Sequence, residues 1–256
     1  MTDPRNTFPE PKRLTRVKSM LKLDFYRLFR SPIFYIMLGV AALIPALVLA
    51  MGGLENPESG TEAFKIDNAW QLISTKGSAF AVNGFAGFAT IDMVFIFAGI
   101  LMSIFVARDY SSGFIKNVFT VHSKKEDYVI SKIAIGVFSG ICMIATYFLG
   151  TVLAGAITSK SFDVSAGGLI LCLLSKMSMM VVFCSLYLAV AVFFKEKLWA
   201  TIPVTILLGM MFYPVAIFAN LESNVLIFFM SLIGSALLGT VFFFVTKLFL
   251  AKRDLA

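Results

Sequence analysis

Apolar residues fill four long stretches of the chain that contain no Lys, Arg, Asp or Glu. These charge-free stretches are residues 31–54, 133–159, 198–221 and 223–246. Each exceeds the roughly 20 helical residues that cross a hydrocarbon layer ~30 Å thick. Two further stretches, around 88–107 and 167–194, are equally apolar but carry one charge each, Asp92 and Lys176. The pattern therefore predicts six transmembrane helices.

The expected fold is an all-α integral membrane protein with a six-helix transmembrane domain over residues 31–250. We place its spans at about 33–52, 88–107, 133–157, 167–194, 200–219 and 225–247. Residues 1–11 are polar and contain three prolines, which predicts a flexible lead, and residues 251–256 form a short polar tail.

A basic amphipathic segment precedes the first span. Between residues 12 and 30, apolar side chains recur at spacings of three and four, and basic side chains occupy much of the rest. The apolar positions are Leu14, Val17, Leu21, Phe25 and Leu28. This periodicity predicts a helix that lies in the plane of the inner membrane interface. The alternative is a positively charged flank that only fixes the orientation of the first span.

The distribution of basic residues sets the orientation of the spans. Of the 22 Lys and Arg residues, 18 fall in the segments that a six-span arrangement places on one side: 1–32, 108–132, 195–199 and 247–256. Because Lys and Arg near span ends stay in the cytoplasm, both termini are expected there. The net charge of +7 is therefore a topology signal and gives no support to a nucleic-acid partner.

Composition excludes a water-soluble globule, because 59% of the residues are hydrophobic and 14% are charged, against about 25% charged in soluble domains. The residues needed for hydrolysis are also missing. The chain has a single histidine, His122, one carboxylate within the spans, and no phosphate-binding loop of the Gly-x-x-x-x-Gly-Lys type. We expect no enzymatic activity, no metal site and no cofactor bound by this chain. Cys142, Cys172 and Cys184 are expected to be buried as small hydrophobes.

Asp92 and Lys176 are candidate functional residues, because a charge inside a membrane is costly unless it is partnered. Both lie toward the outer side of their predicted spans. The lysine is expected to reach the outer headgroups or make a structural contact; a place on a substrate pathway and an ion pair with Asp92 remain open.

Small residues recur at four-residue spacing as Gly136-x-x-x-Gly140 and as Ser231-x-x-x-Ser235-x-x-x-Gly239. They are expected to serve helix packing within the chain, with packing between chains as the alternative.

The cytoplasmic segment 108–132 mixes charges with apolar residues at helical spacing. The apolar residues are Phe114, Ile115, Val118 and Phe119. An exposed apolar face on the cytosolic side predicts a docking surface for a partner. The alternative is a loop helix that packs on its own span ends.

This segment resembles the first cytoplasmic loop of the membrane subunits of type-two ATP-binding-cassette exporters, most closely small bacterial permeases of peptide and lantibiotic export or immunity. In that family an acidic residue is followed four positions later by glycine, then by a basic stretch that ends in lysine. Asp109, Gly113, Lys124-Lys125 and Lys132 occupy these positions. Two departures are Asp109 in place of glutamate and His122-Ser123 in place of a proline-containing turn.

The resemblance implies a permease in the bacterial cytoplasmic membrane, surrounded by lipid, that dimerises with a second copy or a paralogous permease. Each copy would dock a cytosolic ATPase subunit, which supplies ATP and Mg²⁺. The coupling residues would be Asp109, Gly113, Phe114, Ile115, Val118, Phe119, Lys124, Lys125 and Lys132. The expected cargo is an amphipathic peptide or a hydrophobic drug. An ATP-independent secondary carrier or channel, and a membrane anchor that does not transport, are the alternatives.

Overall fold

The computed structural model describes residues 13–51, 68–73, 90–120, 124–212, 215, 219–220 and 224–252, without the side chains of residues 51, 119, 120 and 252. The expected flexible lead and most of the expected tail lie outside these residues. His122, the single histidine of the chain, also lies outside them.

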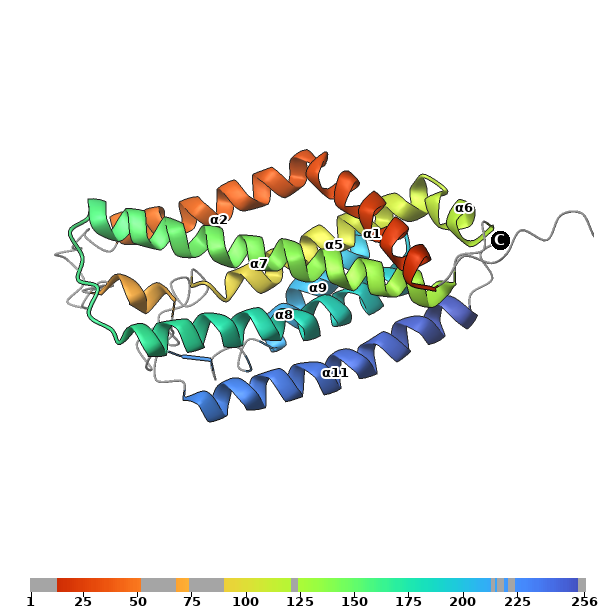
Figure 1. The fold of residues 1–256 in the computed structure, drawn as a ribbon. Coiled ribbons are helices and arrows are strands. Elements are labelled where there is room, and N and C mark those ends of the chain that lie inside the picture. Colours follow the sequence, from red (N-terminus) through yellow and green to blue (C-terminus); the bar gives the residue numbers. More distant parts are fainter. Residues whose placement is uncertain are drawn as a thin grey trace, which may run out of the picture.

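The described chain is all-helical, as expected for a multi-pass membrane protein (Figure 1). Its helices are α1 (Arg13–Phe29), α2 (Pro32–Met51), η2 (Ala69–Leu72), α5 (Met93–Ser111), α6 (Phe114–Thr120), α7 (Lys125–Ile157), α8 (Ala166–Phe194), α9 (Leu198–Met211) and α11 (Val225–Lys252). Within the described ranges, five of these are long and apolar enough to cross a membrane: α2, α5, α7, α8 and α11.

The region of the expected span 200–219 differs from the prediction. Here α9 has 14 residues and ends at Met211. At ~1.5 Å per residue it is about 21 Å long, which is shorter than the ~30 Å hydrocarbon layer. The described residues therefore contain five helices of spanning length and one shorter apolar helix.

The helices α7 and α8 form the centre of the bundle (Figure 1). α2 packs along α7, α11 packs along α8, and α5 lies against α8 and α9. Small residues permit close packing here: a Cβ built on Gly136 would lie 2.8 Å from the sulfur of Met102, and one on Gly140 would lie 2.6 Å from the sulfur of Met180. The prediction of packing within the chain is confirmed for these two glycines.

The contact between α2 and α7 is also close. A Cβ built on Gly150 of α7 would lie 2.5 Å from the carbonyl oxygen of Ala42 in α2. In the C-terminal part of α7, the ring of Trp70 from η2 stacks on Phe148 with 5.6 Å between centroids. Its indole Nε1 donates a hydrogen bond of 3.0 Å to the carbonyl oxygen of Phe162.

The connection between α5 and α7, expected as one cytoplasmic loop over residues 108–132, consists largely of helix. α5 starts later than expected, at Met93, and continues to Ser111. Gly113 then adopts a φ of +68°, in the left-handed region that favours glycine after a helix C-terminus. The short helix α6 follows, and α7 already begins at Lys125.

The helix α1 forms over nearly the predicted range, and most of the predicted apolar face turns inward: Leu28 is buried, and Val17, Leu21 and Phe25 are half-buried. Its buried residues are Met20, Asp24 and Leu28, whereas Leu14, expected on the apolar face, is 81% exposed. Leu14 therefore does not pack on the bundle, and contact with lipid stays a prediction for it, while the inward side of α1 packs on the charged first turns of α7. Ionic contacts as well as apolar contacts therefore determine which side of α1 faces inward.

Candidate functional site

One end of the bundle gathers α1, α6, the start of α7 and the end of α11 (Figure 1). Four charged residues from three helices meet there. Lys132 Nζ of α7 lies 2.6 Å from Asp24 Oδ1 of α1 and 2.7 Å from Asp109 Oδ2 of α5. Arg27 Nη2 of α1 lies 2.6 Å from Asp109 Oδ1. We call these two cations and two carboxylates the inner charge cluster.

Neighbouring side chains complete the inner charge cluster. The hydroxyl of Tyr128 donates to Asp109 Oδ2 at 3.0 Å, and the hydroxyl of Ser131 donates to Asp24 Oδ2 at 2.7 Å. Lys132, Asp24 and Asp109 are fully buried. Burial of charges is tolerated when they are paired and hydrogen-bonded. Both carboxylates here are paired with cations, and hydrogen bonds reach both oxygens of Asp24 and one oxygen of Asp109, whereas Asp109 Oδ1 has an ion-pair contact without a hydrogen bond.

Aromatic rings join α6 to the inner charge cluster. The guanidinium of Arg27 lies 4.4 Å from the ring centroid of Phe114, the first residue of α6, and 5.2 Å from that of Phe105. The ammonium of Lys132 lies 4.5 Å from the Phe105 centroid and 5.5 Å from the Phe114 centroid. Cations attract aromatic faces at these distances. The position of α6 is therefore linked to α1, α5 and α7.

A second set of ionic contacts lies at the start of α7. Arg16 Nε of α1 lies 3.1 Å from Asp127 Oδ2, and Arg13 Nη2 lies 3.4 Å from Glu126 Oε2. Lys247 of α11 pairs with Glu126 as well. The ammonium of Lys125 donates a hydrogen bond of 2.8 Å to the carbonyl oxygen of Leu250, close to the C-terminal end of α11. The first turn of α7 thus holds α1 and α11 together.

The predicted coupling residues fall into an inward and an outward set. Ile115 is 1% exposed and belongs to the hydrophobic core, while Phe114 and Val118 are half-buried. Asp109 and Lys132 lie in the inner charge cluster. Among the described side chains of α6, Lys116 and Asn117 are exposed, and Lys124 is exposed just before α7. The side chain of Phe119 lies outside the described residues.

The two charges predicted inside the membrane form an ion pair. Lys176 Nζ of α8 lies 2.5 Å from Asp92 Oδ1, and both side chains are buried. The preferred expectation was an amine that reaches the outer headgroups or makes a structural contact, and its first part was wrong, because the amine has a carboxylate partner inside the bundle. The alternative left open, an ion pair with Asp92, is confirmed. Asp92 is the residue directly before α5 and does not lie one turn inside the helix. We call Asp92 and Lys176 the outer pair.

The outer pair has further polar atoms nearby. Cys172 lies one turn before Lys176 on α8, and its sulfur is 3.3 Å from the carbonyl oxygen of Ala219. Among the described residues, Asp92 Oδ2 and the hydroxyl of Ser175 are buried without a hydrogen-bond partner. The second carboxylate oxygen is therefore less well satisfied than the first.

The three cysteines are free thiols, and Cys172 and Cys184 are buried, as expected for small hydrophobes. Cys142 is half-buried. In the part of the chain that the structure describes, no group of three or more His, Cys, Asp and Glu side chains could hold a metal ion.

Sequence reasoning missed several members of the ionic network, including Asp24, Arg27 and Tyr128. One signal was present for Asp24, which is the only acidic residue between residues 12 and 30, a segment with seven basic ones. A lone carboxylate on such a helix indicates a specific partner. The partner of Asp24 could not be read from spacing, because Lys132 is more than 100 residues away.

These features define a multi-pass helical membrane protein in which buried charges tie the connection between α5 and α7 to the neighbouring helices. Residues 20–215 match the family model described as ABC-2 family transporter protein. The chain therefore belongs to the ABC-2 transporter family, whose members are membrane transport components that work with an ATPase. No curated protein and no solved structure gave a significant match.

Proposed function

We propose that this chain is the permease subunit of an ATP-driven exporter in the bacterial cytoplasmic membrane, with both termini in the cytoplasm and α1 in the inner membrane interface. Its cargo would be an amphipathic peptide, in antimicrobial-peptide export or immunity, or a hydrophobic drug. ATP and Mg²⁺ would be bound by separate cytosolic ATPase subunits. The family match supports the transporter class, and the site geometry supports the coupling route.

The observation that carries this proposal is the link between α6 and the inner charge cluster. Phe114 of α6 contacts Arg27 and Lys132, and these two cations share the carboxylates of α1 and α5. A displacement of α6 by an ATPase would therefore act on α1, α5 and α7 at once. A change in ATPase state would favour one arrangement of these helices over another.

Residues of the cytoplasmic connection would have two different tasks. Lys116, Asn117 and Lys124 are exposed and would contact the ATPase directly. The inward-facing residues Asp109, Phe114, Ile115 and Lys132 would position α6, as would the turn at Gly113 and the half-buried Val118. Lys125 would hold the end of α11, and Phe119 would contribute apolar contact to the ATPase.

The cargo would pass between two permease copies, or between this permease and a paralogue, because the charges within the described bundle are already paired with each other. The helix α9 would take part in this dimer. It carries exposed apolar side chains, among them Trp199, Leu207 and Met211. Cysteines introduced at these positions should cross-link two chains if α9 lies at the dimer contact.

The docking surface can be tested in the complex with the native ATPase. Lys116→Glu reverses an exposed charge on α6 and should release or uncouple the ATPase. Lys197→Glu is the matched control, because Lys197 is an exposed lysine in another connection assigned to the cytoplasmic side. If Lys116→Glu leaves ATPase binding and turnover at the level of Lys197→Glu, α6 is not the docking element.

Stimulation of ATPase turnover separates the classes of function. The complex, reconstituted in liposomes, would be given a cationic amphipathic peptide or a hydrophobic dye. An exporter couples ATP turnover to one of these ligands. A secondary carrier or channel would move the ligand without ATP, and a membrane anchor would do neither.

A further inference from the structure

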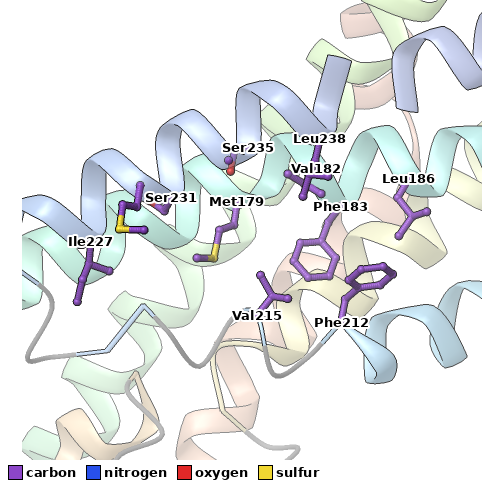
Figure 2. A pocket seen from close by; sticks show the side chains of 12 residues that line it. Met179, Val182, Phe183, Leu186, Phe212, Val215, Ile227, Ser231, Ser235 and Leu238 are labelled. Atoms are coloured by element: carbon purple, nitrogen blue, oxygen red, sulfur yellow. The ribbon is translucent and has the colours of Figure 1, made fainter. Parts of the chain in front are cut away.

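A cavity of about 300 Å³ lies between α8, α11 and the chain that follows α9 (Figure 2). Met179 and Phe183 enter it from α8, and Phe212 and Val215 face them from the end of α9. Ser231 and Gly234 line it from α11. Its volume is at the lower end of the range of small-molecule sites in proteins, which is about 300–1,000 Å³.

The chemistry of the lining selects an uncharged occupant. None of the lining residues carries a charge, and the only polar side chains among them are Ser231 and Ser235. The Ser231 hydroxyl already has partners within the helices. It donates a hydrogen bond of 2.8 Å to the carbonyl oxygen of Phe228 and lies 3.1 Å from the hydroxyl of Ser178. A charged or strongly polar group placed there would lose its hydration without a matching partner.

The cavity also has open space at a backbone position. A Cβ built on Gly234 would meet no atom within 4 Å, whereas one built on Gly239 of the same helix would lie 3.1 Å from Val181. α11 therefore touches α8 closely at Gly239 and leaves room at Gly234. A void next to packed apolar atoms forfeits dispersion contacts unless something fills it.

The surroundings of the cavity identify what fills it. α8 and α11 are both of membrane-spanning length, and Gly234 lies about 14 Å along α11 from Val225 at ~1.5 Å per residue. The cavity is thus at hydrocarbon depth. α11 is also the least buried of the five candidate spans, so most of its apolar surface is open to the hydrocarbon at this depth.

We propose that this cavity binds one acyl chain of a membrane phospholipid, held between α8, α11 and the end of α9. The two methionines of the lining, Met179 and Met230, suit such a flexible occupant because unbranched thioether side chains adapt to irregular apolar shapes. The bound chain fastens α11 to the bundle. This proposal requires neither transport nor an ATPase partner.

The test uses the full chain in nanodiscs of phosphatidylethanolamine and phosphatidylglycerol, doped with phosphatidylcholine that carries a photoreactive diazirine in mid-chain. Adducts are mapped by mass spectrometry after irradiation. The expected result is labelling concentrated on the cavity residues, Met179 and Met230 among them. A Cβ at Gly234 meets no atom within 4 Å, and the larger side chain of Gly234→Leu would occupy the cavity and should abolish this labelling.

Ala236→Leu is the matched control, because Ala236 is exposed on the same helix and does not line the cavity. This variant adds a similar bulk toward the lipid and should leave the labelling unchanged. Adducts spread evenly over the exposed face of α11, and insensitive to Gly234→Leu, would show boundary lipid only and overturn the proposal. Loss of cavity labelling on addition of a hydrophobic dye, with other adducts unchanged, would assign the cavity to a transported ligand and also overturn it.

Discussion

The outer pair provides a direct test of how buried charges act in this bundle. Replacing Lys176 by Met removes the cation and leaves the carboxylate of Asp92 buried without its partner 2.5 Å away. Breaking a buried ion pair on one side costs about 3–5 kcal/mol, because an uncompensated charge remains. Asp92→Asn removes the carboxylate from the buried ammonium of Lys176 and should also destabilise the protein.

The two single variants should nevertheless differ. Asp92 directly precedes α5, so its negative charge lies at the positive end of that helix. This position stabilises an anion by about 0.3–1 kcal/mol, and up to ~2 kcal/mol when it is partly buried. Asp92 keeps this stabilisation when Lys176 is replaced, whereas Lys176 lies in the middle of α8, where no helix end stabilises its charge. Lys176→Met should therefore be the milder of the two substitutions.

The double variant Asp92→Asn/Lys176→Met carries no charge at this position. It should be more stable than either single variant, losing about 1–3 kcal/mol for the amide left unsatisfied in the interior. The free energy of unfolding would be measured by SDS titration in mixed micelles for all four proteins. A coupling free energy of at least about 2 kcal/mol is expected, whereas independent sites add to within about 0.3–0.5 kcal/mol. Additive losses would refute the reasoning.

Two further comparisons use the same unfolding measurement. Lys132→Met should cost about 3–5 kcal/mol, because two buried carboxylates lose their cation. Lys247→Met should cost only about 0–1 kcal/mol, since the side chain of Lys247 is 40% exposed. Equal losses in the two variants would contradict the assigned burial. Gly150→Ala should cost about 1–3 kcal/mol, because its Cβ would clash with the carbonyl of Ala42. Gly39 lies in α2, the helix that contacts Gly150, but a Cβ built on it meets open space. Gly39→Ala should therefore be neutral or stabilising by about 0.5–1 kcal/mol, and a loss as large as that of Gly150→Ala would contradict the close helix contact.

The all-helical, multi-pass architecture could be predicted because hydrocarbon allows few alternatives. A long stretch without charges must satisfy its backbone internally, and a helix does so within one segment. Helix ends were harder to predict. α7 begins at Lys125, before its apolar stretch, because a polar helical turn remains stable when its charges find partners on α1 and α11.

The candidate site could be predicted only in part. Asp92 and Lys176 stood out as two opposite charges in apolar surroundings, but their separation of 84 residues gave no indication that they touch. The inner charge cluster was less visible, since Asp24 and Lys132 are surrounded by other charges in the sequence. Which charge turns inward depends on how α1 crosses α7, a tertiary contact that local periodicity does not encode.

The length of α7 has a mechanical consequence. Its 33 residues contain no proline and run for about 50 Å at ~1.5 Å per residue. The ionic contacts hold it within its first two turns, and Trp70 and α2 contact it near the opposite end. An unbroken helix held in this way acts as a lever: a tilt of roughly 6° about the held end moves the far end by ~5 Å, close to one helical pitch. A small rotation at the end of α7 that carries Lys132 would thus displace the opposite end of this helix by a distance close to one helical pitch.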